Sequence, residues 1–166
     1  RYKETDDDFV SAVGRKQQTD ANAFFLEVPI QEHYINRHRT DISNTLFSLP
    51  YPGYDISRLP LVQNADIINL HWVSQFQSPV TLHKLFALGK PVVWTLHDQW
   101  AFTGGCHYSS GCEGYQNSCK ECPQLADDPF CLPEAVLHDK EDLFQNANLT
   151  IVTPSRWMGR CARESR

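Results

Sequence analysis

The 166-residue sequence lacks the features that mark several large classes of protein. It has no apolar run of about 18 residues, so no segment is predicted to span a membrane. A formal net charge of -5, with scattered lysines and arginines, argues against a nucleic-acid-binding protein, which needs clustered positive charge. Residues 1–8 are polar and acidic, which excludes a signal peptide in this sequence. These absences predict a soluble cytoplasmic domain that binds no nucleic acid.

Glycine-rich nucleotide motifs and repeats are also missing. No G-x-G-x-x-G motif follows a candidate strand, which disfavours a dinucleotide-dependent oxidoreductase and predicts no redox cofactor. No internal repeat or low-complexity segment is present. The length suits one domain with a single sizeable core.

Three short apolar runs, rich in β-branched residues, are typical of buried strands. They cover residues 67–70, 92–96 and 149–152. Helix-like segments separate them, over residues 79–88 and 133–146. Gly89 suits the end of the first helix, and Ser155 suits the N-cap of a last helix that ends at Arg163. This alternation predicts an α/β fold, a Rossmann-like parallel sheet with helices on both faces.

The first 64 residues carry weaker patterns. Residues 9–13 and 24–28 are candidate strands, and residues 31–47 form a candidate polar helix. One face of that helix would carry Tyr34, His38 and Ile42. Residues 49–61 contain three prolines and a glycine, which predicts a loop.

The most informative stretch runs from Trp94 to Tyr108, where an apolar run ends in His97-Asp98 before a loop rich in glycine, aromatic residues and cysteine. Open α/β sheets build ligand sites from polar groups at the carboxyl ends of their strands. A histidine there can bond to a sugar hydroxyl or stabilise a departing phosphate, and a neighbouring carboxylate can orient it. The alternative is that His97 only bonds to backbone at a strand end. A metal-dependent phosphohydrolase is disfavoured because the His-Asp pair follows a strand.

Other polar and aromatic residues are predicted at the same edge of the sheet. The pairs His71-Trp72 and Ser155-Arg156 end the neighbouring strands. The loop after His97 offers aromatic faces for a sugar and glycines that allow close approach of the backbone to a ligand. The helix that begins near Ser155 favours anions at its N-terminus, although Arg156 alternatively is only solvated there. The candidate substrate-binding residues are His71, Trp72, Trp100, Thr103, Gly104, Gly105, Tyr108, Ser155 and Arg156.

Four of the six cysteines follow closely in the spacing C-x5-C-x6-C-x2-C. They are Cys106, Cys112, Cys119 and Cys122. Four thiolates in one short loop can surround a structural Zn²⁺ ion tetrahedrally, at roughly 2.3 Å per sulfur. Two disulfides or four free thiols are the alternatives, and His107 is a candidate substitute ligand. The remaining cysteines, Cys131 and Cys161, are expected to be packing residues.

Three segments together resemble one family of enzymes. They are KPVVWTLHDQWAFTGGCHY (90–108), CKECPQL (119–125) and IVTPSRW (151–157). Over residues 66–166 the sequence is similar to bacterial family 4 glycosyltransferases of exopolysaccharide and capsule assembly. The resemblance implies the N-terminal, acceptor-side half of a retaining GT-B enzyme. It also implies a catalytic role for His97, which would meet the donor sugar. Asp98 is the second catalytic candidate, as the neighbouring carboxylate that can orient His97.

The resemblance carries further expectations about substrates and domains. The co-substrate is a nucleotide-sugar held mainly by a C-terminal domain with an E-x7-E motif, which has no counterpart here. The acceptor is a glycan or lipid-linked glycan, met by a cytoplasmic enzyme or one peripherally associated with the inner face of the membrane. Residues 1–166 are thus expected to be a single-domain fragment that is inactive alone. The alternative is a non-catalytic, zinc-stabilised module that presents its cysteine loop to a partner protein.

Overall fold

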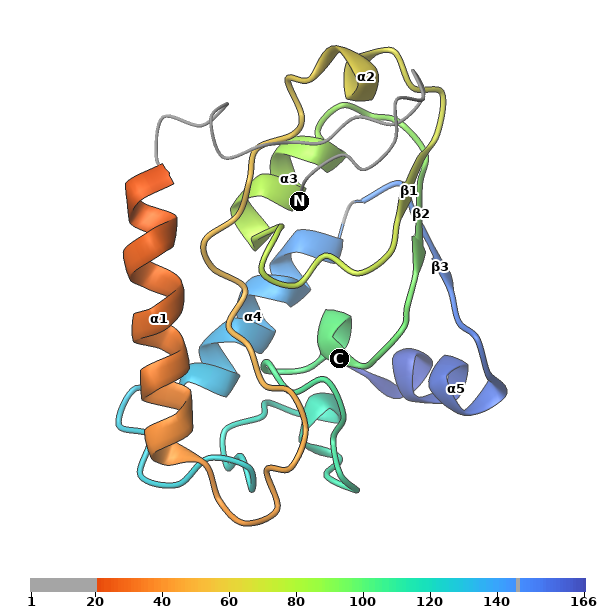
Figure 1. Cartoon of the computed structure of the whole chain (residues 1–166). Helices are drawn as coiled ribbons and strands as arrows, with labels where there is room; N and C mark the ends of the chain where they lie inside the picture. Colours follow the sequence, from red (N-terminus) through yellow and green to blue (C-terminus); the bar gives the residue numbers. More distant parts are fainter. Residues whose placement is uncertain (1–20, 146) are drawn as a thin grey trace.

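The computed structural model describes residues 21–145 and 147–166. They form a mixed α/β fold in which helices flank a small parallel sheet (Figure 1). The helices are α1 (Ala21–His38), α2 (Pro60–Gln63), α3 (Pro79–Phe86), α4 (Leu132–Phe144) and α5 (Arg156–Glu164). The strands are β1 (Ile68–Leu70), β2 (Val92–Thr95) and β3 (Leu149–Val152). Two short 3₁₀ helices, η2 (Trp100–Phe102) and η3 (Gly114–Gln116), lie between β2 and α4.

The sheet has the order β1-β2-β3, and both neighbouring pairs are parallel. Ile68, Val92 and Leu149 stand in register across it. This confirms the predicted α/β class and the parallel pairing of the three apolar runs. As a consequence, the residues that follow each strand all emerge at one edge.

The crossover helices α3 and α4 contact each other and cover one face of the sheet (Figure 1). The connections β1-α3-β2 and β2-α4-β3 step across the sheet in the same direction. Because such crossovers are right-handed, both helices lie on the same side of the sheet. On the opposite face, Asn69 and Val152 are exposed, and Thr95 is partly exposed. The two crossover helices α3 and α4 therefore share one face of the sheet.

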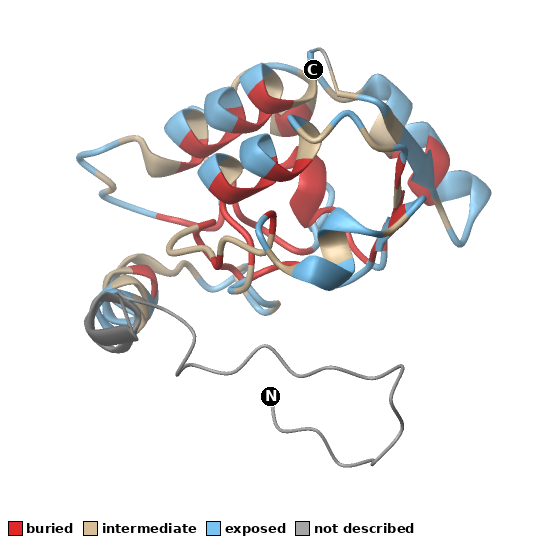
Figure 2. Cartoon of the chain, turned by 90° about the horizontal axis from the view of Figure 1, so that it is seen from above, coloured by how far each residue is buried: buried red, intermediate tan, exposed pale blue. Residues whose placement is uncertain are grey.

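Helix α3 begins at Pro79 as predicted and ends at Phe86, two residues before its predicted end. The Ser78 hydroxyl accepts a hydrogen bond from the backbone N–H of Thr81, whose side chain in turn accepts from the Ser78 N–H. This capping box satisfies amides that have no partner within the helix. Gly89 then turns the chain with φ of +70°, a conformation that favours glycine. The inward faces of α3 and α4 are buried, and their outward faces are exposed (Figure 2).

Leu85 tests how far this core depends on α3. Its side chain is 0 % exposed, so Leu85→Ala is expected to lower the free energy of unfolding by about 2–5 kcal/mol through lost burial and a residual cavity. Val80 lies on the same helix and is 59 % exposed, so Val80→Ala is expected to stay within about 0.5 kcal/mol. Urea unfolding of the two variants checks this difference. Equal losses would show that the inner face of α3 does not support the core.

The N-terminal part differs from its predictions. Residues 24–28 belong to the single helix α1 rather than to a strand, and α1 ends at His38 instead of continuing to residue 47. A short apolar run cannot distinguish a buried strand from a helix segment by periodicity, which explains this error. The candidate strand at residues 9–13 lies outside the described residues. Residues 49–59 are irregular, as predicted, before α2 begins at Pro60.

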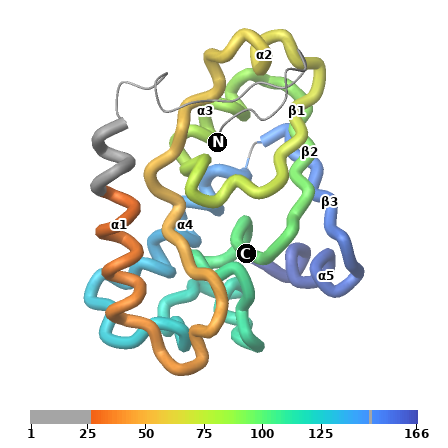
Figure 3. Tube along the Cα trace, in the orientation of Figure 1, coloured from red at the N-terminus to blue at the C-terminus, as the bar shows by residue number. Residues whose placement is uncertain are grey.

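The end of α1 is attached to the loop that precedes α4, and the two segments run side by side (Figure 3). The N–H of Thr40 donates to the carbonyl of Gln124 at 3.1 Å, and the N–H of Ala126 donates to the carbonyl of His38 at 2.7 Å. Ile35 is buried in a second, smaller apolar cluster with Phe47, Leu49, Cys106, Leu125 and Val136. The cysteine-rich segment is therefore packed from two sides, by α1 and by α4.

Candidate functional site

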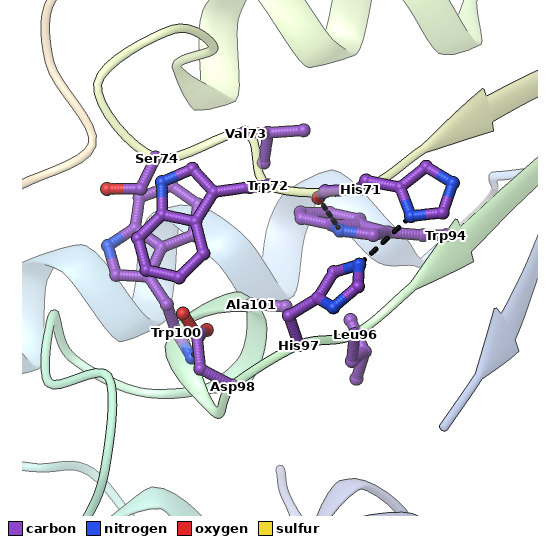
Figure 4. Close-up of a pocket in the computed structure, with 10 residues that line it drawn as sticks. All are labelled: His71, Trp72, Val73, Ser74, Trp94, Leu96, His97, Asp98, Trp100 and Ala101. Atoms are coloured by element: carbon purple, nitrogen blue, oxygen red, sulfur yellow. Dashed lines mark hydrogen bonds between the residues drawn. The ribbon is translucent and has the colours of Figure 1, made fainter. Parts of the chain in front are cut away.

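Two histidines meet where β1 and β2 end. His71 directly follows β1, and His97 lies two residues after β2. The His71 Nδ1 and His97 Nε2 atoms are 2.9 Å apart, and both side chains are exposed (Figure 4). One of these two nitrogens must carry the proton for the bond to form, so the pair is a proton donor and acceptor at the sheet edge. The structure thus brings together two of the predicted site residues.

A small cavity lies beside the histidine pair. It has a volume of about 20 Å³, enough for roughly one water molecule and too little for a sugar ring. The Trp94 Nε1–H donates to the carbonyl of His71 at 3.1 Å and fixes the end of β1 there. The surface available to a larger ligand is the exposed edge around His71 and His97. The cavity lining is His71, Trp72, Val73, Ser74, Trp94, Leu96, His97, Asp98, Trp100 and Ala101.

Asp98 points away from His97 and into the protein, so its expected role of orienting His97 has to be corrected. Two hydrogen bonds hold its carboxylate in the loop that follows. The Asp98 Oδ1 atom accepts from the backbone N–H of Trp100 at 2.8 Å. Its Oδ2 atom is 2.6 Å from the Nδ1 atom of His107. Asp98 therefore holds the loop that follows His97.

His107 has a structural role in this site that the sequence did not predict. Its side chain is 1 % exposed, and its Nε2 atom is 2.8 Å from Ser48 Oγ. Ser48 Oγ in turn lies 2.7 Å from Ser74 Oγ. The order Ser48, His107, Asp98 matches a hydrolase triad, but its burial leaves no access for a substrate. These contacts also remove His107 from the candidate zinc ligands, because both ring nitrogens already have protein partners.

Trp72 and Tyr108 supply exposed aromatic surface at the edge. Trp72 is 48 % exposed, and its indole stacks on the His107 ring with centroids 5.0 Å apart. Tyr108 is 45 % exposed, and its hydroxyl donates to the carbonyl of His97 at 3.4 Å. Both rings are anchored at the sheet edge while leaving surface free for a ligand.

Trp100 is buried beneath this edge. Its Nε1–H donates to the carbonyl of Ser48 at 2.9 Å, and the ammonium group of Lys140 lies 4.0 Å from its ring centroid. Trp100 lines the small cavity, but protein atoms occupy the rest of its surroundings. Its sugar-facing role is therefore corrected to one of support.

Three other predicted ligand contacts are also buried. Thr103 is 0 % exposed, and its hydroxyl donates to the carbonyl of Cys106 at 2.6 Å. A Cβ atom on Gly104 would lie 2.4 Å from the carbonyl oxygen of Pro133, so this glycine permits a close backbone contact. Gly105 has φ of +126° and packs against Phe47. These three residues shape the loop from within rather than forming its outer surface.

Ser155 and Arg156 follow β3 at the same edge of the sheet but do not line the cavity. The Ser155 hydroxyl accepts from the N–H of Met158 at 3.1 Å, which confirms its predicted N-cap role. Both residues are exposed. A ligand contact at either position stays a prediction.

The four clustered cysteines are free thiols that line one apolar cavity. Burial raises the pKa of Cys106 to about 12 and that of Cys119 to about 11. Lys140 is buried close to both, and desolvation lowers its pKa to about 7. The described residues hold no group of three or more His, Cys, Asp or Glu side chains already arranged to bind a metal ion.

Within the described residues, every helix is too short or too polar to cross a lipid bilayer. A wider hollow of about 630 Å³ opens in the loop before α4, among residues that include Glu121, Asp127 and Asp128. It does not include the histidine pair. The sheet edge remains the place where the predicted site residues meet.

Comparison with known proteins adds one match. Over 73 residues the chain is 36 % identical to the putative colanic acid biosynthesis glycosyl transferase WcaC of Escherichia coli strain K12. The matched region is 42 % of this chain and only 18 % of that protein. No family model matches the sequence, and no solved structure matches it. The chain is thus similar, over part of its length, to a protein named as a glycosyl transferase.

Proposed function

We propose that this chain is part of a glycosyltransferase and that the sheet edge around His71 and His97 faces the sugar that is transferred. The observation that most directly supports this proposal is the exposed histidine pair at the carboxyl ends of two parallel strands, with Trp72 and Tyr108 beside it. The partial similarity to a protein named as a glycosyl transferase supports the same activity.

The chemistry of the edge suits sugar transfer. A histidine nitrogen can donate to a sugar hydroxyl or to the phosphate oxygen that gains charge as the nucleotide leaves. The 2.9 Å contact between His71 and His97 orients the two rings, so that His97 presents its remaining nitrogen away from His71. The exposed faces of Trp72 and Tyr108 can pack on the apolar C–H face of a sugar.

The proposal includes a division of labour between two domains. The cavity beside the histidines has room for about one water molecule, and in this proposal the nucleotide-sugar is held largely by residues outside this chain. This chain then forms the acceptor-side half of a retaining GT-B enzyme. Its acceptor is a glycan or lipid-linked glycan, reached in the cytoplasm at the inner face of the membrane.

The test uses the complete protein that contains this chain. Release of free nucleotide is measured with a panel of nucleotide-sugars and glycan acceptors, and the anomeric configuration of the product is read by NMR. We expect transfer with retention by the complete protein and none by residues 1–166 alone. A folded, complete protein that releases nucleotide from no donor would favour the non-catalytic binding module instead.

A further inference from the structure

We propose that Cys106, Cys112, Cys119 and Cys122 bind one structural Zn²⁺ ion. All four line a single cavity of about 20 Å³, whose other lining is largely apolar and includes Tyr115. That volume accommodates roughly one water-sized particle. Four thiolates are the ligand set of a closed tetrahedral zinc site, and these four side chains would form it by closing on an ion in this space. The proposal does not depend on glycosyl transfer.

A backbone amide points at the sulfur of Cys112. The N–H of Gly114 donates to Cys112 Sγ at 3.2 Å. A thiol is a weak acceptor, whereas a thiolate bound to a metal accepts such bonds well. This contact suits a charged sulfur ligand at Cys112.

The sulfur of Cys119 lies close to that of Cys112. A Cβ atom built on Gly114 would lie 3.2 Å from Cys112 Sγ and 3.8 Å from Cys119 Sγ, which places these two sulfurs around the same glycine. The backbone of Cys106 is held beside them, because its carbonyl accepts from the Thr103 hydroxyl at 2.6 Å.

Lys140 supplies a compensating charge beside the cavity. Its Nζ atom donates to the carbonyls of Trp100 at 2.5 Å and Thr103 at 2.9 Å, within electrostatic reach of Cys106 and Cys119. Four thiolates around Zn²⁺ carry a net charge of about -2. Asp98 is one anion within its electrostatic reach, and thiolates at Cys106 and Cys119 would add to this compensation.

The segment that carries the ligands needs such a clamp. Residues 103–131 contain no strand and only the short helix η3, yet Thr103 and His107 within it are almost fully buried. Ordering irregular backbone costs about 1–2 kcal/mol per residue. Zinc binding closes the sulfurs on the cavity: four S–H bonds break, four Zn–S bonds form, and four protons pass to solvent.

The test begins with metal analysis of the chain purified under reducing conditions, where we expect about one zinc per chain. Replacement by Co²⁺ gives a second readout, because tetrahedral thiolate coordination produces strong visible absorption bands. Cys122→Ser is expected to lose these bands. Cys131→Ser is the matched control, because Cys131 is also a free thiol of the segment but does not line the cavity, and it should retain them.

Removing zinc from the unsubstituted chain with a chelator, then titrating with Co²⁺, keeps the test valid if Cys122→Ser does not fold. Saturation at one ion per chain supports the site. The proposal is overturned if the reduced protein holds no zinc and gives no cobalt bands. It is equally overturned if Cys131→Ser abolishes binding, or if mass spectrometry finds the four cysteines paired as disulfides in freshly isolated protein.

Discussion

On the proposed function, replacing His97 by alanine is expected to lower the turnover of the complete protein about 10²- to 10³-fold, the usual cost of removing one positioned hydrogen-bond donor from a reaction centre. The side chain is exposed, and its bond is to the ring of His71, which is exposed too. No buried packing is lost. The free energy of unfolding should therefore change by no more than about 0.5 kcal/mol.

Nucleotide release under saturating donor and acceptor measures this effect, and urea unfolding measures the stability. His138→Ala is the matched control, because His138 is an exposed histidine of α4 whose ion-pair partner is the nearby Asp142 at 3.5 Å. It should keep full turnover. Unchanged turnover in His97→Ala would remove His97 from the reaction, whereas a large loss of stability would assign it a role in folding.

The sheet was predictable because each of its strands has a local sequence signal. Val92, Val93 and Trp94 form a short apolar run between a glycine-terminated helix and a polar loop, a pattern that fits a buried parallel strand. The regular alternation with helices then fixes the topology. In α1 the apolar run of residues 24–28 has no such context, and the same residues fit a helix equally well, so the sequence misplaced the element.

The exposed residues of the candidate site were predictable from the sequence, whereas the buried contacts beneath them were not. His97 follows a strand, so its exposure at the sheet edge follows from topology. The hydrogen-bond partners of Asp98 do not follow from topology. His107 joins Asp98, nine positions away, to Ser48, which is 59 positions away from His107, and no local pattern connects such distant residues. Burial of Trp100 likewise depends on Lys140 and Ser48, which arrive from separate parts of the chain.

The second large effect is expected at His107, and it concerns stability first. His107→Ala should lower the free energy of unfolding by about 3–5 kcal/mol, because it leaves the Asp98 carboxylate without its partner in a buried site. It also removes the ring on which Trp72 stacks. His83→Ala, an exposed position on α3, is the control and should stay within about 0.5 kcal/mol.

Asn at position 107 separates the two contacts of the ring. Its amide can still donate to Asp98 from near the position of Nδ1, but it cannot reach Ser48, so His107→Asn should cost less than His107→Ala. A double-mutant cycle with Asp98→Asn should give a coupling free energy of about 1 kcal/mol or more, since contacting residues in one buried network are not additive. Additive losses would mean that Asp98 and His107 stabilise the loop separately. Because this loop carries Tyr108 and begins beside His97, coupled losses would explain how a buried pair sets the geometry of an exposed site.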